Sequence, residues 1–165
     1  MDMPHSDSSL DPKQLRLIQK LRLMDDRFMR ACFEDNIPCV ELVLRIILEK
    51  PDLTVLSART QHPLQSLRGA RSICLDVFAK DSVGRLYNLE IQRKSVDAER
   101  SRLHSALLDA SALEAGEAFS RLPESWVIFI MERDPFKKDA ALYHFVRYMP
   151  DLQVSLNDGS HIVYV

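Results

Sequence analysis

The chain has 165 residues, with 22 basic side chains against 24 acidic ones and a net charge of −2. This length suits one domain with a single core, and the charge balance is not typical of proteins that bind nucleic acid through overall positive charge. Its three cysteines include no C-x-x-C pair, which argues against a disulfide framework and a zinc site. No apolar run has the length of a membrane span and no signal peptide is evident, so we expect a cytoplasmic protein.

The N-terminal 30 residues divide into two segments. Residues 1–11 are dominated by Ser, Asp and Pro, and we predict a disordered lead-in there. Residues 12–30 carry a rough helical stripe of apolar side chains, accompanied by six basic ones. This basic segment is interpreted either as a solvated helix face or as an arm that contacts phosphates.

A helix is predicted over residues 38–49, because Pro38 suits a first helical turn and Pro51 ends the pattern. Its apolar positions, Val40 and Leu44 among them, recur at helical spacing and should face the core. A short strand over 53–56 and a polar connection over 60–71 are expected to follow.

The pattern of residues 71–94 predicts two strands joined by a turn of about five residues that contains Gly84. Alternation places one set of apolar residues on one side: Ile73, Leu75, Val77, Tyr87, Leu89 and Ile91. For these faces to coincide, Leu75 must pair with Ile91 and Val77 with Leu89. The same register sets Asp76 directly opposite Glu90.

The other face of this hairpin then carries Asp76, Glu90 and Gln92. Opposed strand positions have Cβ atoms about 5 Å apart, and facing carboxylates destabilise a sheet unless a proton, a cation or a metal relieves their repulsion. One interpretation is a solvated face with incidental acids. The other is a site for Mg²⁺ or Mn²⁺, with Gln92 as a third oxygen donor.

A further helix is predicted from Ser95 or Asp97, either of which can cap it, to about Ala115, with Leu103 and Leu107 in the core. The densest basic cluster near the acids joins the end of the second strand to the start of this helix: Arg93, Lys94, Arg100 and Arg102. A helix N-terminus beside such a cluster favours phosphate binding, although a charge-balanced surface is the alternative.

The last part of the chain predicts three strands, a buried one over 126–131, one near a sheet edge over 141–148 and a short one over 162–165. The helix at 97–115 should return the chain so that strand 126–131 runs parallel to a strand of the hairpin. We therefore expect an α/β domain whose mixed sheet is flanked by helices.

Several motifs together resemble the PD-(D/E)xK nuclease superfamily, and within it the recombination-promoting nuclease, or PD-(D/E)xK transposase, group. They are LDV at 75–77, the turn with Gly84, NLEIQ at 88–92, RLHS at 102–105, GEAF at 116–119, LPE at 122–124 and WVIFI at 126–130. The likeness covers the chain from about Asp25 onward. One departure is Gln92, which stands where the superfamily usually has Lys.

The resemblance implies a restriction-endonuclease-like αβββαβ core over residues 25–165, preceded by an accessory segment at 1–24, and relatives that continue past Val165. It implies an Mg²⁺-dependent DNA endonuclease, serving recombination or mobile elements, with Asp76 and Glu90 as metal ligands. A helix before the first strand often adds a Glu in this superfamily. Glu41 is the best match for this further ligand, and Glu34 and Asp35 remain alternatives.

In this reading Gln92 positions a water or contacts the phosphate, while Arg93, Lys94, Arg100 and Arg102 bind the DNA. Lys94 is a candidate for the positive charge that Gln92 lacks. The competing hypothesis is a catalytically inactive module of the same fold that binds DNA or protein. A homodimer is a further expectation.

Overall fold

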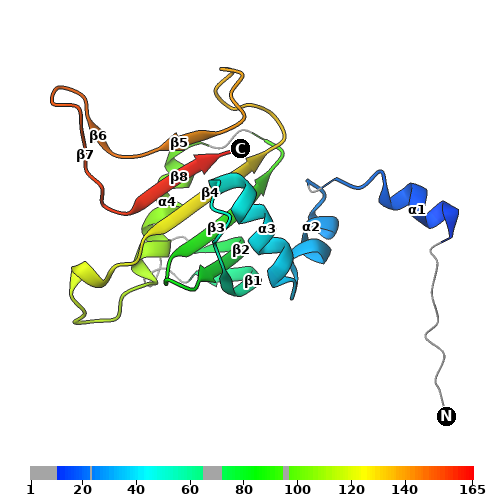
Figure 1. Cartoon of the computed structure of the whole chain (residues 1–165), viewed down its shortest axis with the longest axis horizontal. Helices are drawn as coiled ribbons and strands as arrows, with labels where there is room; N and C mark the ends of the chain where they lie inside the picture. Colours follow the sequence, from blue (N-terminus) through cyan, green and yellow to red (C-terminus); the bar gives the residue numbers. More distant parts are fainter. Residues whose placement is uncertain (1–10, 23, 65–71, 95–96) are drawn as a thin grey trace, which may run out of the picture.

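The structure is a computed structural model, and it describes residues 11–22, 24–64, 72–94 and 97–165. These ranges contain α1 (Pro12–Ile18), α2 (Asp26–Phe33), α3 (Ile37–Leu48) and α4 (Ala98–Ala110). A six-stranded sheet has the order β1-β2-β3-β4-β8-β5, with α3 and α4 on opposite faces (Figure 1). The strands are β1 (Val55–Leu64), β2 (Ile73–Asp81), β3 (Leu86–Gln92), β4 (Ser125–Met131), β5 (Tyr143–Phe145) and β8 (Ser160–Tyr164). The expected α/β class with a mixed sheet is confirmed.

Strand directions follow from the connections. β1, β2 and β3 are successive antiparallel neighbours, whereas α4 carries the chain back so that β4 runs parallel to β3. β8 is parallel to β4, and the short β5 pairs antiparallel with β8 at the sheet edge. The predicted strand at 162–165 therefore lies inside the sheet, and the one at 141–148 is shorter than expected.

The hairpin β2–β3 has the predicted register where the two strands pair, with Val77 opposite Leu89 and Lys80 opposite Leu86. Gly84 lies in the connecting turn at φ 93°, a left-handed conformation that glycine adopts without strain. The turn residues 82–85 are close to the predicted length. The predicted pairs Leu75–Ile91 and Asp76–Glu90 are not part of this register, because the pairing ends at Val77–Leu89.

The expectation of one continuous apolar face on β2 is wrong. Ile73 and Leu75 pack into the cluster beneath α4, whereas Val77 packs into the cluster beneath α3. The change of face coincides with Gln61 of β1, which has φ 51° and lies between the pairs Thr60–Val77 and His62–Leu75. A residue in the left-handed conformation rotates the paired strands β1 and β2 locally. The side chains of β2 therefore change face at Asp76.

Helix α3 forms where the sequence predicts it. The Asn36 side chain accepts a hydrogen bond from the Cys39 amide at 3.2 Å, and Glu49 ends the helix in the left-handed conformation. Val40 and Leu44 are fully buried and pack against Val77 and other apolar residues of the sheet. This face has an ordinary apolar core.

Helix α4 begins where the sequence predicts, after Asp97, but it departs from the prediction at its C-terminal end and in its buried face. It ends at Ala110, not near residue 115, and its N-cap residue Asp97 makes no side-chain capping bond. Ser95 lies outside the described residues. The buried positions follow the helical repeat and are mostly polar: Ser101, His104, Ser105 and Leu108. The predicted core residues Leu103 and Leu107 are half-buried.

The first part of the chain also differs from the prediction. The single stripe over 12–30 is broken into α1 and α2, and α1 buries none of its residues and lies apart from the sheet (Figure 1). β1 extends from Val55 to Leu64, so it includes part of the predicted polar connection. The predicted lead-in at 1–10 lies outside the described residues. In the ranges that the structure describes, no helix has both the length and the apolar character needed to cross a bilayer.

Candidate functional site

Two carboxylates meet where the pairing between β2 and β3 ends. The Asp76 amide donates to Glu90 Oε1 at 3.2 Å, and the Ile91 amide donates to Asp76 Oδ2 at 3.0 Å. Each carboxylate thus accepts a backbone N–H of the other strand, directly after the pair Val77–Leu89. The structure brings the two predicted acids together and fixes both by backbone hydrogen bonds.

Glu90 is buried between β3 and α4, with 1% of its surface exposed. Its Oε2 lies 3.3 Å from Arg100 Nη2, and its Oε1 lies 3.6 Å from His104 Nδ1. Burial, and secondly the nearby negative charge of Asp76, raise the pKa of Glu90 to about 7. The positive charge of Arg100 lowers this pKa but does not offset the effects of burial and Asp76.

A second buried polar pair lies beside Glu90. Asn88 Nδ2 is 3.0 Å from His104 Nδ1, and both side chains are buried. Burial, followed by the charge of Arg100, lowers the pKa of His104 to about 4, so the imidazole is neutral at pH 7. Within the described part of the chain, Asn88 Oδ1 is a buried side-chain oxygen without a hydrogen-bond partner.

An open cavity of about 490 Å³ lies beside Asp76, and the buried Glu90 is not among the residues that line it. Asp76 and Gln92 line it, and so do four basic residues: Arg30, Arg93, Lys94 and Arg100. Gln92 Oε1 accepts a hydrogen bond from Arg100 Nη1 at 3.2 Å, while the same guanidinium contacts Glu90. Arg100 thus connects the buried acid to the open cavity.

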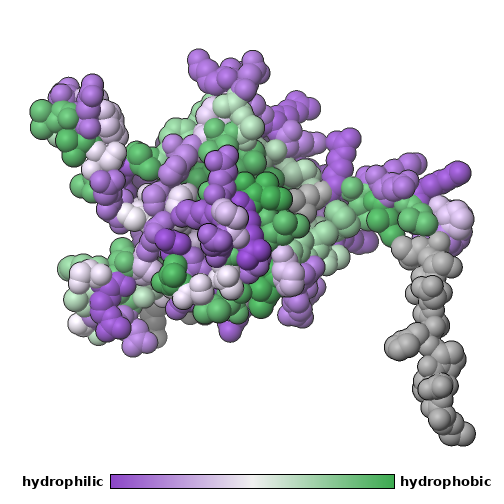
Figure 2. Space-filling view, viewed as in Figure 1, coloured by the Kyte–Doolittle hydropathy of each residue, from purple (hydrophilic) through white to green (hydrophobic). Residues whose placement is uncertain are grey.

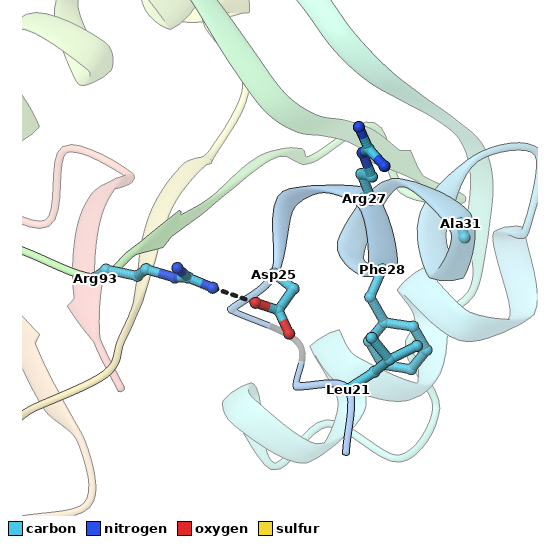
Figure 3. Close-up of a pocket in the computed structure, with 6 residues that line it drawn as sticks. All are labelled: Leu21, Asp25, Arg27, Phe28, Ala31 and Arg93. Carbon is cyan, nitrogen blue, oxygen red and sulfur yellow. Dashed lines mark hydrogen bonds and ion pairs between the residues drawn. The ribbon is translucent and has the colours of Figure 1, made fainter. Parts of the chain in front are cut away.

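The N-terminal segment adjoins this cavity through Arg93. Arg93 Nε donates to the Met24 carbonyl at 2.9 Å, and its guanidinium forms an ion pair with Asp25 (Figure 3). A second open cavity, of about 660 Å³, is lined by Arg93 together with Leu21, Phe28 and other residues of this segment (Figure 3). Arg93 is therefore shared between the two cavities and is held by the segment before α2.

The structure does not bring Glu41 to the other acids. Glu41 Oε2 accepts from the Val55 amide at 2.8 Å, and Oε1 lies 2.7 Å from Arg45 Nη2. Val55 pairs with Asp81, five residues along β2 from Asp76, which is about 17 Å of strand. The alternatives Glu34 and Asp35 lie exposed between α2 and α3. Glu41 therefore fastens α3 to the start of β1.

Of the four predicted DNA-binding residues, Arg102 is the one that does not line the cavity. It is exposed on α4 two positions after Arg100, which is a rotation of about 200° round the helix. Lys94 lines the cavity, as Arg93 and Arg100 do.

Sequence reasoning did not single out Gln61, Asn88 or His104 as members of the site, whereas Arg30 belongs to the basic segment 12–30, for which contact with phosphates is one of the two interpretations. Gln61 gave no signal, because its nearness to Asp76 depends on the register of β1. The sequence did contain a signal for Asn88 and for His104. Asn88 lies two residues before Glu90 on the same face of β3, and His104 lies one helical turn after Arg100.

The donor set suits a hard cation held by few protein ligands. The described residues contain no group of three or more His, Cys, Asp or Glu side chains that is placed to hold a metal. Two carboxylates and the Gln92 amide oxygen remain, and Mg²⁺ commonly takes one or two carboxylates and completes its shell with water and phosphate oxygens. Searches of protein-family models, curated proteins and solved structures found no match to this chain.

Proposed function

We propose that the chain is a Mg²⁺-dependent DNA endonuclease of the PD-(D/E)xK type, with Asp76 and Glu90 at its centre. The observation that carries this proposal is the pair of acids, held by each other's strands, of which Asp76 lines a cavity with four basic side chains. The order α3-β1-β2-β3-α4-β4 supports it, because the restriction-endonuclease-like core has the same αβββαβ order.

The residues present fit the metal that this function requires. Asp76 and Glu90 would hold one or two divalent cations, and a cation between them would relieve the repulsion that contributes to the raised pKa of Glu90. When bound, Mg²⁺ lowers the pKa of a coordinated water and neutralises charge on the scissile phosphate.

The protein side chains supply position and charge. Asp76 and Glu90 are oriented in advance by backbone N–H groups, so little reorganisation is needed when substrate binds. Lys94, Arg30 and Arg100 surround the cavity and attract the phosphate backbone. Gln92 orients a water or a phosphate oxygen through its amide, but it can neither accept a proton as a base nor contribute a charge.

An inactive module that binds DNA is the second candidate. Gln92 stands in place of the usual Lys, and Arg100 already pairs with Glu90 and Gln92. An internal ion pair of this kind lowers the need for a metal while leaving the basic cavity free to hold DNA.

Nicking of supercoiled plasmid with Mg²⁺ or Mn²⁺ tests the proposal. The wild type is expected to nick only with metal, and Asp76→Ala and Glu90→Ala are each expected to abolish nicking. A wild type that does not nick but still binds DNA would favour the inactive module. Nicking that survives both substitutions would indicate a contaminant and contradict the assignment of the two acids.

A matched pair of basic residues tests the cavity in the same assay. Lys94→Ala removes a charge that lines the cavity, whereas Arg102→Ala removes one on another side of α4. Lys94→Ala is expected to weaken DNA binding and to reduce the slope of log affinity against log salt by about 1, and Arg102→Ala is expected to change neither. Equal effects of the two would show that the cavity is not the DNA-binding surface.

A further inference from the structure

Residues 145–157, here called the arm, begin at the last residue of the edge strand β5, leave the sheet and return to it before β8. The arm contains β6 (Tyr148–Met149) and β7 (Val154–Ser155), which form a separate two-stranded sheet. In Figure 1 this ribbon extends beyond the six-stranded sheet at the upper left. Two-stranded ribbons are at best marginally stable alone in water, so the arm is short of stabilising partners.

The arm is unusually apolar for an exposed ribbon. Figure 2 shows hydrophobic residues gathered over its tip. Seven large apolar residues of the arm are between 44% and 68% exposed: Phe145, Val146, Tyr148, Met149, Leu152, Val154 and Leu156. Soluble monomers rarely expose apolar side chains contiguously in this way, and such patches commonly mark interaction sites.

Apolar side chains project from both faces of the ribbon. Met149 pairs with Val154, and the Leu156 amide bonds to the Arg147 carbonyl, so Met149, Val154 and Leu156 share one face. Tyr148 lies on the other face, because neighbouring residues of a strand alternate. A partner that covers the arm must therefore enclose it or extend it as a sheet.

The charges of the arm do not favour a strongly charged partner. Arg147 forms an ion pair with Asp158 just beyond the arm, and the other charged residue within the arm is Asp151. This is unlike the cavity before Asp76, which four basic residues line. The arm therefore suits a protein surface of the same apolar kind.

The exposed area is about what a dimer needs. With roughly 150 to 200 Å² for a fully exposed large apolar residue, the seven side chains offer on the order of 600 Å². Specific interfaces begin at about 600 Å² per partner, and the backbone edges of β6 and β7 add to this area. A second copy of the arm supplies a surface of equal size and the same apolar character.

We propose that the arm is the dimerisation element of the protein, and that the arms of two copies pair across a two-fold axis. Such pairing is self-complementary, since each copy contributes the same surface, and each arm then covers apolar side chains of the other arm. The inference goes beyond the nuclease proposal and does not depend on it.

The test is the mass of the full chain in solution at tens of micromolar, measured by light scattering during gel filtration. The arm variant is Met149→Lys with Leu156→Lys, two exposed positions on one face. The control is Leu42→Lys with Ile46→Lys, which adds the same charges at exposed positions of α3. The wild type and the control are expected at twice 19.0 kDa, and the arm variant at 19.0 kDa.

Two results would overturn the proposal. One is a wild type that remains at 19.0 kDa up to about 100 μM, where an interface of this size should be populated. The other is a dimer that survives in the arm variant while the control behaves in the same way. Thermal melts of both variants check that the substitutions leave the fold intact, which is expected because all four positions are exposed.

Discussion

The two faces of the sheet are covered by helices of similar length, and the side chains that these helices bury differ in polarity. On one face α3 buries Val40 and Leu44 against an apolar cluster. On the other, α4 buries Leu108 together with three polar residues, Ser101, His104 and Ser105, and Glu90 and Asn88 of β3 lie beneath it. Because buried polar groups cost free energy unless they are paired, the first face is built for stability and the second retains groups that stability alone does not require.

Side-chain hydrogen bonds supplement the apolar contacts of Leu108 on the α4 face. Ser105 Oγ lies 3.0 Å from Ser160 Oγ, and Ser125 Oγ donates to Asp109 Oδ1 at 2.8 Å. These bonds join α4 to β8 and β4. These hydrogen bonds therefore fix the position of α4 on the sheet. A site that must hold Glu90 in one position needs such a fixed helix.

The largest expected effect concerns the apolar face. Leu44→Ala should lower the free energy of unfolding by about 2 to 5 kcal/mol, because it leaves a cavity at a fully buried position. Urea denaturation measures the loss, and Leu42→Ala, which lies 57% exposed on the same helix, should cost under about 0.5 kcal/mol. Equal effects of the two substitutions would contradict the assignment of the buried face.

The next effect concerns the pH dependence of the polar face. The pKa of Glu90 in the folded protein, about 7, lies above its ordinary 4.5, so the folded state binds more protons than the unfolded state between these values. The free energy of unfolding should therefore fall as the pH rises through this window. Glu90→Gln removes the effect and should be more stable than the wild type by about 3 kcal/mol at pH 8, with little difference at pH 4.

Denaturation without divalent metal, repeated from pH 4 to pH 8, measures this difference. His104→Gln is the control of opposite sign, since the lowered pKa of His104 provides stability that is lost as the pH falls from about 6.5 towards 4. A constant difference between Glu90→Gln and the wild type across the range would mean that Glu90 is not the buried, titrating acid described above.

The smallest expected effect concerns the N-terminal caps of α3 and α4. Asn36 caps α3 with a side-chain hydrogen bond, whereas Asp97 at the start of α4 makes none. Asn36→Ala should cost about 1 kcal/mol of unfolding free energy, and Asp97→Ala only a few tenths. Thermal denaturation distinguishes the two, and a larger loss at Asp97 would reverse the comparison.

The sequence predicts the α3 face well because local rules decide it. Pro38 and Pro51 indicate the limits of the helix, and the spacing of Val40 and Leu44 indicates its buried side. The register of Val77 with Leu89 is predictable for a similar reason, since period-2 alternation allows few pairings.

The α4 face could not be predicted by the same rules. A search for an apolar stripe selects Leu103 and Leu107, but the sheet below supplies polar partners, so Ser101, His104 and Ser105 are buried instead. The turn of the ribbon at Gln61 depends on a positive φ that no local motif announces. The sequence could not place Glu41 away from the other two acids, because spacing does not show that its carboxylate accepts a hydrogen bond from the Val55 amide.

The most direct measurement is a calorimetric titration of Mn²⁺ into the wild type, Asp76→Ala and Glu41→Ala. The proposed site predicts that the wild type and Glu41→Ala bind Mn²⁺, because Glu41 is held at the other end of β1, and that Asp76→Ala does not. A wild type without affinity for Mn²⁺, or binding that is unchanged in Asp76→Ala, would contradict a metal site at the paired acids.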